Sequence, residues 1–184
     1  VEYNRVLEAI GRRTDSLQLL RHTAAAANES SSAEDALAVV LEEVCRFTGW
    51  PIGHAFLASR DDPELLVSTG IWHLSDPVRY RPLRDATEGK PIRAGSGLPG
   101  VALQSRQPIF VSSEDQGGEG AESETLTYVS LEPIQGPGAS SLVKPLEVVG
   151  GERKTAVWAK LGLRAGLAVP VMAGTSAVGV LEFF

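Results

Sequence analysis

The residues in this sequence that are best suited to chemistry are three histidines and one cysteine, and they are scattered along the chain. His22, His54, His73 and Cys45 show none of the short spacings that bring metal ligands together. The sequence also lacks a Gly-x-Ser-x-Gly nucleophile elbow and a cysteine–histidine pair close in sequence. We therefore expect no metal site and no catalytic nucleophile, and we expect that the chain is not an enzyme.

Two of these residues leave alternatives open. His54 lies in a predicted strand, where it is either an ordinary sheet histidine or the single axial ligand of a heme. Cys45 falls beside the apolar face of a predicted helix, which indicates a buried structural thiol, with a redox-sensing role as the alternative. A single cysteine excludes an internal disulfide and fits a reducing, cytoplasmic location.

A glycine-rich segment, Gly95-Ser96-Gly97-Leu98-Pro99-Gly100, matches the dinucleotide-binding fingerprint letter for letter. That chemistry requires an apolar strand before the glycines and a full helix after them, so that the helix N-terminus meets the pyrophosphate. Here Lys90-Pro91-Ile92-Arg93 precedes the motif, and Pro108 follows it closely. The glycines therefore indicate a tight turn that leads into a short helix.

The composition of the chain argues against nucleic acids and membranes as binding partners. The 184 residues fit one domain with an extension, and the net charge is −6, which is unfavourable for binding nucleic-acid backbones. No apolar run reaches the roughly 18 residues that a membrane-spanning helix needs, and the N-terminus lacks a signal-peptide pattern.

The chain starts at Val1 and stops at Phe184 inside an apolar run, so we expect an excerpt that continues into an output domain.

The predicted elements start with two helices. In residues 2–27, apolar side chains at Tyr3, Leu7, Ile10 and Leu17 recur at helical spacing and form either a dimer seam or a face that packs on its own domain. We favour the dimer and divide the chain into a signalling helix, residues 1–30, and a sensory domain, residues 31–184. The second helix starts at a capping box in which Glu34 follows Ser31 by three residues, and it ends before Gly49 and Pro51.

The later segments predict an α+β fold with an antiparallel sheet. Short helices are expected from Ser75-Asp76-Pro77, with an interruption at Pro82, and over Val101–Arg106. Residues 112–151 form an insertion, long enough to be functional or loose. The predicted strands are Ile52–Ser59, Leu65–His73 and Pro108–Val111, followed by an extra hairpin of Leu126–Leu131 and Leu142–Val149. A short helix is predicted over Arg153–Leu161. A final hairpin of Leu163–Met172 and Ala177–Phe184 ends the chain.

Four segments together resemble a GAF domain of the kind found in bacterial sensor histidine kinases. They are Gly49-Trp50-Pro51, the run from Thr69 to Pro77, the glycine motif leading to Pro108-Ile109-Phe110-Val111, and the run from Gly162 to Val171 with Val178–Phe183. The resemblance implies a six-stranded antiparallel sheet, with N-terminal helices on one face and a ligand pocket under loops and short helices on the other. It also implies a homodimer that senses a small molecule and regulates an attached output domain in a two-component system.

The sequence departs from three branches of that family. The cysteine that attaches bilins, the Asn-Lys…Phe-Asp-Glu signature of cyclic-nucleotide phosphodiesterases, and the cysteine set of free-methionine-sulfoxide reductases are all missing. The ligand and any cofactor therefore stay unknown. A dimerisation module that binds no ligand, and a heme or redox sensor, are the alternatives to a ligand-sensing domain.

Strand alternation assigns the pocket side. Within the first predicted strand, Ile52, His54 and Phe56 point to one face, whereas the small Gly53 and Ala55 point to the other and suit the close approach of a helix. We expect the larger side chains to line the pocket. The candidate pocket residues are Ile52, His54, Phe56, Trp72, Leu98 and Phe110.

Overall fold

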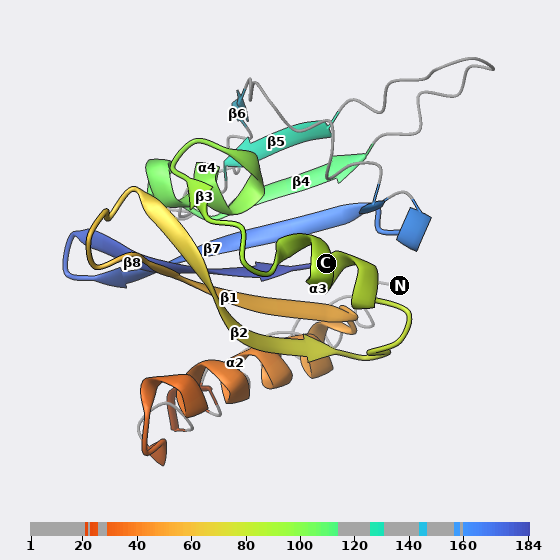
Figure 1. Cartoon of the computed structure of the whole chain (residues 1–184), viewed down its shortest axis with the longest axis horizontal. Coiled ribbons are helices and arrows are strands. Elements are labelled where there is room, and N and C mark those ends of the chain that lie inside the picture. The colour runs from red at the N-terminus through yellow and green to blue at the C-terminus, as the bar shows by residue number, and fades with distance from the viewer. Residues whose placement is uncertain are drawn as a thin grey trace, which may run out of the picture.

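A computed structural model describes residues 21, 23–25, 29–113, 126–130, 144–146, 157–158 and 160–184 of the chain. In these residues eight antiparallel strands form one sheet, in the order β3-β2-β1-β8-β7-β4-β5-β6 (Figure 1). The predicted α+β class is confirmed. The strands are β1 (Ile52–Ala58), β2 (Leu65–Leu74), β3 (Ile92–Arg93), β4 (Ile109–Ser113), β5 (Leu126–Ser130), β6 (Lys144–Leu146), β7 (Ala165–Ala173) and β8 (Ser176–Phe183).

The sheet consists of a six-stranded part and an added hairpin. β3, β2, β1, β8, β7 and β4 are neighbours in that order and make up the predicted six-stranded sheet. β5 pairs with β4 on one side and with β6 on the other, so the extra hairpin predicted inside the insertion extends the sheet beyond β4. The rest of the insertion, and the proposed dimer seam in residues 1–20, lie outside the described residues.

Helix α2 (Ala33–Thr48) is capped at both ends by local sequence. Its N-cap is Ser32, whose side chain accepts a hydrogen bond from the Asp35 backbone N–H at 3.0 Å. The predicted capping box was therefore wrong by one residue, because Ser31 instead donates its hydroxyl to the Asp35 carboxylate at 2.7 Å. At the other end Gly49 adopts a left-handed conformation, as the sequence predicted, and donates its N–H to the Cys45 carbonyl.

α2 covers one face of the sheet, which we call the α2 face. The helix lies along β1 and β2 (Figure 1), and Leu41 and Cys45 pack there against Ala55 and Phe183. Gly53 makes this approach possible, since a Cβ atom at this position would lie 3.0 Å from the Cys45 sulfur. The small residues of β1 face the helix as the alternation predicted.

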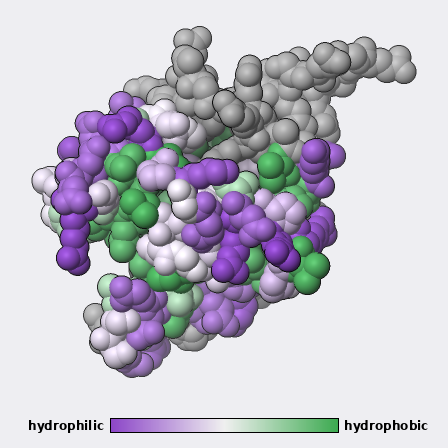
Figure 2. Space-filling model, in the orientation of Figure 1, coloured by the Kyte–Doolittle hydropathy of each residue, from purple (hydrophilic) through white to green (hydrophobic). Residues whose placement is uncertain are grey.

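The opposite face, which we call the α3/α4 face, is covered by α3 (Arg81–Thr87) and α4 (Gly97–Ser105). The chain reaches α3 through a turn in which the Asp76 side chain accepts hydrogen bonds from the backbone N–H groups of Val78 and Arg79. Pro82 was expected to interrupt the helix but lies in its first turn, where proline removes no helical hydrogen bond. Hydrophilic side chains dominate the outer surface over α3 (Figure 2).

The glycine motif forms the tight turn that was predicted. Gly95 and Gly97 have positive φ angles, and the turn leads directly into the nine-residue helix α4, which begins four residues earlier than expected. Gly100 is required by packing, because a Cβ atom there would lie 2.3 Å from the Arg93 carbonyl oxygen. This contact packs α4 directly on β3.

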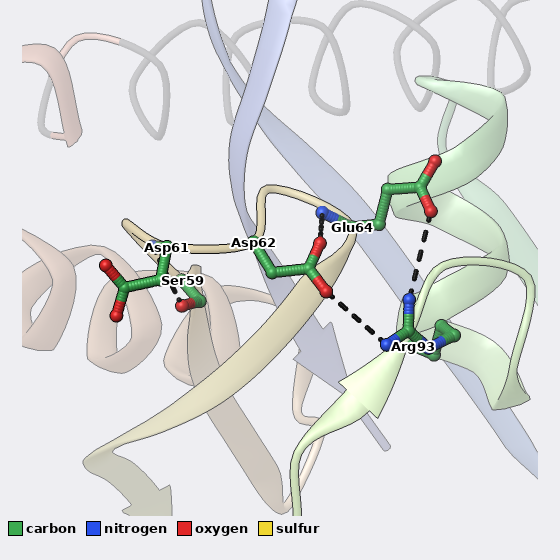
Figure 3. Close-up of polar contacts among 5 residues, drawn as sticks. All are labelled: Ser59, Asp61, Asp62, Glu64 and Arg93. Atoms are coloured by element: carbon green, nitrogen blue, oxygen red, sulfur yellow. Dashed lines mark hydrogen bonds and ion pairs between the residues drawn. The ribbon is translucent and has the colours of Figure 1, made fainter.

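Ion pairs hold the short edge strand β3 against the turn between β1 and β2 (Figure 3). The Arg93 guanidinium lies 3.4 Å from the Asp62 carboxylate and 3.9 Å from the Glu64 carboxylate. The Arg93 and Glu64 side chains are largely exposed and Asp62 is partly exposed, so each pair contributes only about 0–1 kcal/mol. Among the described residues, no helix combines the length and apolar character that a membrane span requires.

Candidate ligand-binding site

The register of the sheet places a row of large and polar side chains across the centre of the α3/α4 face. Trp72 on β2 is opposite His54 on β1, and His54 is opposite Glu182 on β8. Glu182 is in turn opposite Ala168 on β7. The consecutive strands β1 and β2 and the distant strand β8 therefore bring an indole, an imidazole and a carboxyl group together on one surface.

His54 is held from three sides and is fully buried. Its ring stacks on the indole of Trp72, with centroids 3.6 Å apart and an interplanar angle of 9°. Phe56 meets the imidazole edge-on at 4.2 Å, and Nε2 is hydrogen-bonded to the Ser68 hydroxyl at 2.9 Å. These contacts fix both the position and the orientation of the imidazole.

Glu182 is the buried acid of this face, with 3% of its surface exposed. Val180 of β8 and Phe184, the residue after this strand, belong to the apolar cluster under α3 and α4. A cross-strand partner such as His54 has its Cβ about 4.5–5.5 Å away. A buried carboxylate is costly unless hydrogen bonds or an opposite charge compensate it, and the nearest cross-strand neighbour of Glu182 in this row is the His54 imidazole. Sequence reasoning missed Glu182, although a lone acid among the apolar residues 177–184 was a usable signal.

Trp72 connects this row to the covering helix. Its indole N–H donates to the carboxylate of Glu88, the residue that ends α3, at 2.6 Å. Leu83 and Thr87 of α3 are buried, and Leu83 belongs to the same apolar cluster as Phe56. The position of α3 is therefore coupled to the aromatic stack on His54.

Five of the six predicted pocket residues lie together on the α3/α4 side. Ile52, Phe56 and Leu98 belong to its apolar cluster, Trp72 packs against that cluster, and His54 contacts both Phe56 and Trp72. The assignment of Phe110 to this side is wrong.

Phe110 has neighbours that show the reason for the error. Ile109 and Val111 are fully buried in the α3/α4 cluster, so the alternation of β4 turns the intervening Phe110 to the opposite face. There its cross-strand partner is Leu167, which packs against the α2 cluster. The sequence alone did not show which of the two faces of this strand would lie under α3 and α4.

Trp158, which the sequence did not single out, adds a further polar group to the same cluster. Its ring is 5% exposed and meets the Phe184 ring edge-on, with centroids 4.5 Å apart. The indole N–H makes no hydrogen bond within the described part of the chain. A buried N–H group without an acceptor is uncommon in a folded protein.

Cys45 lies away from this row, on the α2 face. Burial raises the pKa of its thiol to about 12, so the neutral thiol predominates at physiological pH. No cluster of three or more metal-ligating side chains occurs among the residues with described positions. The described side chains of the α3/α4 face offer aromatic rings and polar atoms for stacking and hydrogen bonding.

No protein-family model matches the sequence, and no curated protein matches it. Solved structures do resemble the fold. The GAF domain of A. aeolicus nlh2 in an inactive state is 13% identical, with a TM-score of 0.56 over 94% of this chain and 80% of that one. The phycoerythrobilin-bound GAF domain of a cyanobacterial phytochrome is 11% identical, with a TM-score of 0.56 over 93% and 81%.

An enzyme shares the fold as well. The free methionine-R-sulfoxide reductase of Neisseria meningitidis, in complex with its substrate, is 13% identical, with a TM-score of 0.50 over 90% of this chain and 69% of that one. At these identities the likeness establishes the fold alone. The sheet order, the helices on both faces and these likenesses agree, and the chain has the fold of a GAF domain.

Proposed function

We propose that the chain is a small-molecule-sensing regulatory domain of a larger bacterial signalling protein, of the sensor histidine kinase type. The observation that supports this proposal most directly is the row of His54, Trp72 and Glu182 under α3 and α4. Aromatic and polar side chains that converge in an otherwise apolar cluster are typical of a ligand site. The ligand binds on the α3/α4 face, next to this row.

Transmission uses the two-sided structure of the central strands. Along β1, His54 and Phe56 lie on the α3/α4 face, whereas Gly53 and Ala55 lie under α2. A shift of β1 on ligand binding is therefore passed to α2 on the other side. In this proposal α2 continues the signal to residues 1–30, which form the dimer helix, and to an attached output domain in the cytoplasm.

The domain senses rather than catalyses. Reductases that share the fold use a set of cysteines, and this sequence has only Cys45. Its thiol lies on the α2 face with a pKa raised to about 12, which disfavours the thiolate that redox chemistry needs. Cys45→Ser is expected to leave ligand binding unchanged, and loss of binding in a folded variant would support the redox alternative.

A heme on His54 fits the geometry poorly. Nε2 is hydrogen-bonded to Ser68, and one face of the imidazole is covered by Trp72. Iron could reach Nε2 only after the hydrogen bond to Ser68 breaks. A visible absorption band in the purified protein would nevertheless favour the heme sensor over the proposal.

The test of ligand binding compares two histidines of the same sheet. His54→Ala removes the ring under Trp72, whereas His73→Ala is the control, because His73 pairs with Gly53 on the α2 side. Native mass spectrometry of the purified protein should show a bound mass that His54→Ala loses and His73→Ala keeps. Hydrogen exchange should show protection of α3 and α4 in the loaded protein.

A protein that carries no extra mass, and whose α3 and α4 amides exchange equally in the presence and absence of cell metabolite extract, would refute ligand sensing. If the same protein is a dimer in solution, the alternative of a pure dimerisation module is then favoured.

A further inference from the structure

Trp158 has the largest side chain among the described residues that are buried in the apolar cluster under α3 and α4. Its ring is 5% exposed and meets the Phe184 ring edge-on. Phe184 and Leu98 of α4 approach each other over Gly166 of β7, where a Cβ atom would lie 2.9 Å from each of the two side chains. The indole therefore fills space on the face where we propose that the ligand binds.

The polar atom of this indole opposes its burial. The Trp158 N–H makes no hydrogen bond within the described part of the chain, whereas the Trp72 N–H donates to the Glu88 carboxylate. A buried donor without an acceptor costs free energy that it would recover in water. Apolar contacts stabilise the buried position of Trp158, but the net preference is smaller than for a tryptophan whose N–H has an acceptor.

Trp158 lies on a short helical turn and not on a strand of the sheet. The described residues of the range 157–161 are helical, and Gly162 follows with a φ angle of 73°. Glycine adopts this and other conformations at little cost, so the chain can bend here before β7 begins. Phe184, by contrast, exchanges backbone hydrogen bonds with Ile52 and is fixed to the sheet.

An exposed arginine ties this turn to the start of α3. Nη2 of Arg79 donates to the Leu161 carbonyl at 3.1 Å. Arg79 is itself held in place, because its backbone N–H donates to the Asp76 carboxylate at 3.0 Å and its guanidinium lies 5.3 Å from the centre of the Tyr80 ring. Since the Arg79 side chain is exposed, water competes for its hydrogen bond to Leu161. This contact can therefore break and form again without disturbing the cluster.

A ligand that binds inside this cluster has to replace a side chain, because protein interiors are packed as densely as organic crystals. Trp158 is the member best suited to leave. Its N–H gains a partner in water, and its turn is held to α3 by an exposed contact. The space that it vacates has the shape of a flat ring and borders the Phe184 ring within an apolar cluster.

We propose that Trp158 is a displaceable plug, and that the space of its ring is the binding site for a flat apolar or aromatic ligand about the size of indole. Binding moves the turn outward at Gly162 and breaks the hydrogen bond between Arg79 and Leu161. This inference rests on the proposed ligand sensing and specifies where the ligand binds and what shape it has.

The first test loosens the plug. Arg79→Met keeps most of the side-chain length and removes the donors, so amide hydrogen exchange of residues 157–163 in the full chain should accelerate by about threefold or more. Arg81→Met is the matched control, because Arg81 is exposed and pairs with Asp85 on the surface of α3. In this control the exchange of residues 157–163, and in both variants the exchange of β1, should equal that of the wild type.

The second test measures the vacated space with indole as the probe. Calorimetry should show that Trp158→Ala binds indole about tenfold or more tightly than the wild type, in which the plug competes for the same space. Arg79→Met should bind indole more tightly than the wild type by the factor by which its exchange accelerates, because both quantities report the open fraction of the plug. Arg81→Met should bind indole as the wild type does. If Trp158→Ala does not fold, Arg79→Met tests the proposal by itself.

Unchanged exchange of residues 157–163 in Arg79→Met would overturn the inference. So would a folded Trp158→Ala variant that binds indole no more tightly than the wild type. These outcomes leave the proposed function standing if the purified protein carries a mass that depends on His54. Conversely, a plug that opens and admits indole, in a protein that shows neither a co-purified mass nor a response to metabolite extract, would support the inference and contradict ligand sensing.

Discussion

Gly53 offers the sharpest test of how α2 is held on the sheet. A Cβ atom at this position would lie 3.0 Å from the Cys45 sulfur, 3.3 Å from Cδ2 of Leu41 and 3.4 Å from Cδ1 of Phe183. The first distance is at the limit of what real Cβ atoms show, so the Gly53→Ala variant requires that the sulfur or the helix shift. Overpacking of this kind costs about 1–3 kcal/mol.

The change also has a favourable component. Gly53 lies in a strand without a positive φ angle, so alanine can adopt its backbone conformation and reduces the entropy of the unfolded chain by about 0.4–1 kcal/mol. With the midpoints of the two ranges, about 2 and about 0.7 kcal/mol, the balance is a net destabilisation of about 1.3 kcal/mol. For a chain of this size it lowers Tm by roughly 3–5 °C. Calorimetric unfolding measures both quantities.

A double-mutant cycle with Cys45→Ala locates the strain. Removing the sulfur vacates the space that the new methyl group needs, so the two substitutions together should cost less than the sum of their separate effects, by about 0.5 kcal/mol or more. Strict additivity, or a Gly53→Ala variant as stable as the wild type, would refute the conclusion that the Cys45–Gly53 contact sets the distance between helix and sheet.

Other expected outcomes concern the cap, the thiol, the α3 anchor and the N-terminal helix. Ser32→Ala should destabilise α2 by about 0.5–2 kcal/mol in urea unfolding, because the Asp35 N–H loses its acceptor, whereas an equal effect of Ser31→Ala would contradict the assignment of the cap. The pKa of Cys45 is raised from 9.0 to about 12, so the native thiol should react with Ellman's reagent far more slowly at pH 8 than the unfolded chain does. Because the pKa of Cys45 is higher in the folded than in the unfolded chain, the thiol stabilises the fold fully below pH 9, and this stabilisation is lost as the pH rises towards 12. The Cys45→Ser variant has no thiol to ionise, so its free energy of unfolding should fall less between pH 9 and 12 than that of the wild type. Trp72→Phe keeps a ring over His54 but loses the 2.6 Å hydrogen bond to Glu88. Amide hydrogen exchange in α3 should therefore accelerate by the equivalent of about 0.5–1.5 kcal/mol of local stability. Unchanged exchange would show that other contacts hold α3. A chain without residues 1–27 should be monomeric by light scattering, and a dimer would place the interface elsewhere.

Elements with strong local signals were predictable. α2 was expected from its apolar periodicity and from Gly49, and the cap error of one residue arose because three consecutive serines and two consecutive acids lie at its start. The strands were expected from apolar runs between turn residues, and the alternation of β1 separated Gly53 from His54 correctly. These features depend on neighbours within a few positions, which the sequence displays directly.

The candidate site depended on contacts that no local pattern contains. His54, Trp72 and Glu182 meet because β1 pairs with both β2 and β8, and Glu182 lies 128 positions after His54 in the chain. Phe110 was listed as a pocket residue without an assignment of the two faces of β4, and the pairing of β4 with β7 is what places it beside Leu167 on the α2 face. The side chains of a strand always point alternately to the two faces of the sheet. Which of them point to the α3/α4 face is decided by how the strand pairs with its neighbours.

The sequence by itself therefore determined the fold class, the glycine turn before α4 and the separation of small and large side chains along β1. Each follows from backbone conformational preference or from burial of one face of an element. The tertiary structure alone decided that a lone acid of β8 is buried beside a stacked histidine and tryptophan. That outcome is a property of strand register across the sheet, and register is set by long-range hydrogen bonds and packing between segments far apart in the chain.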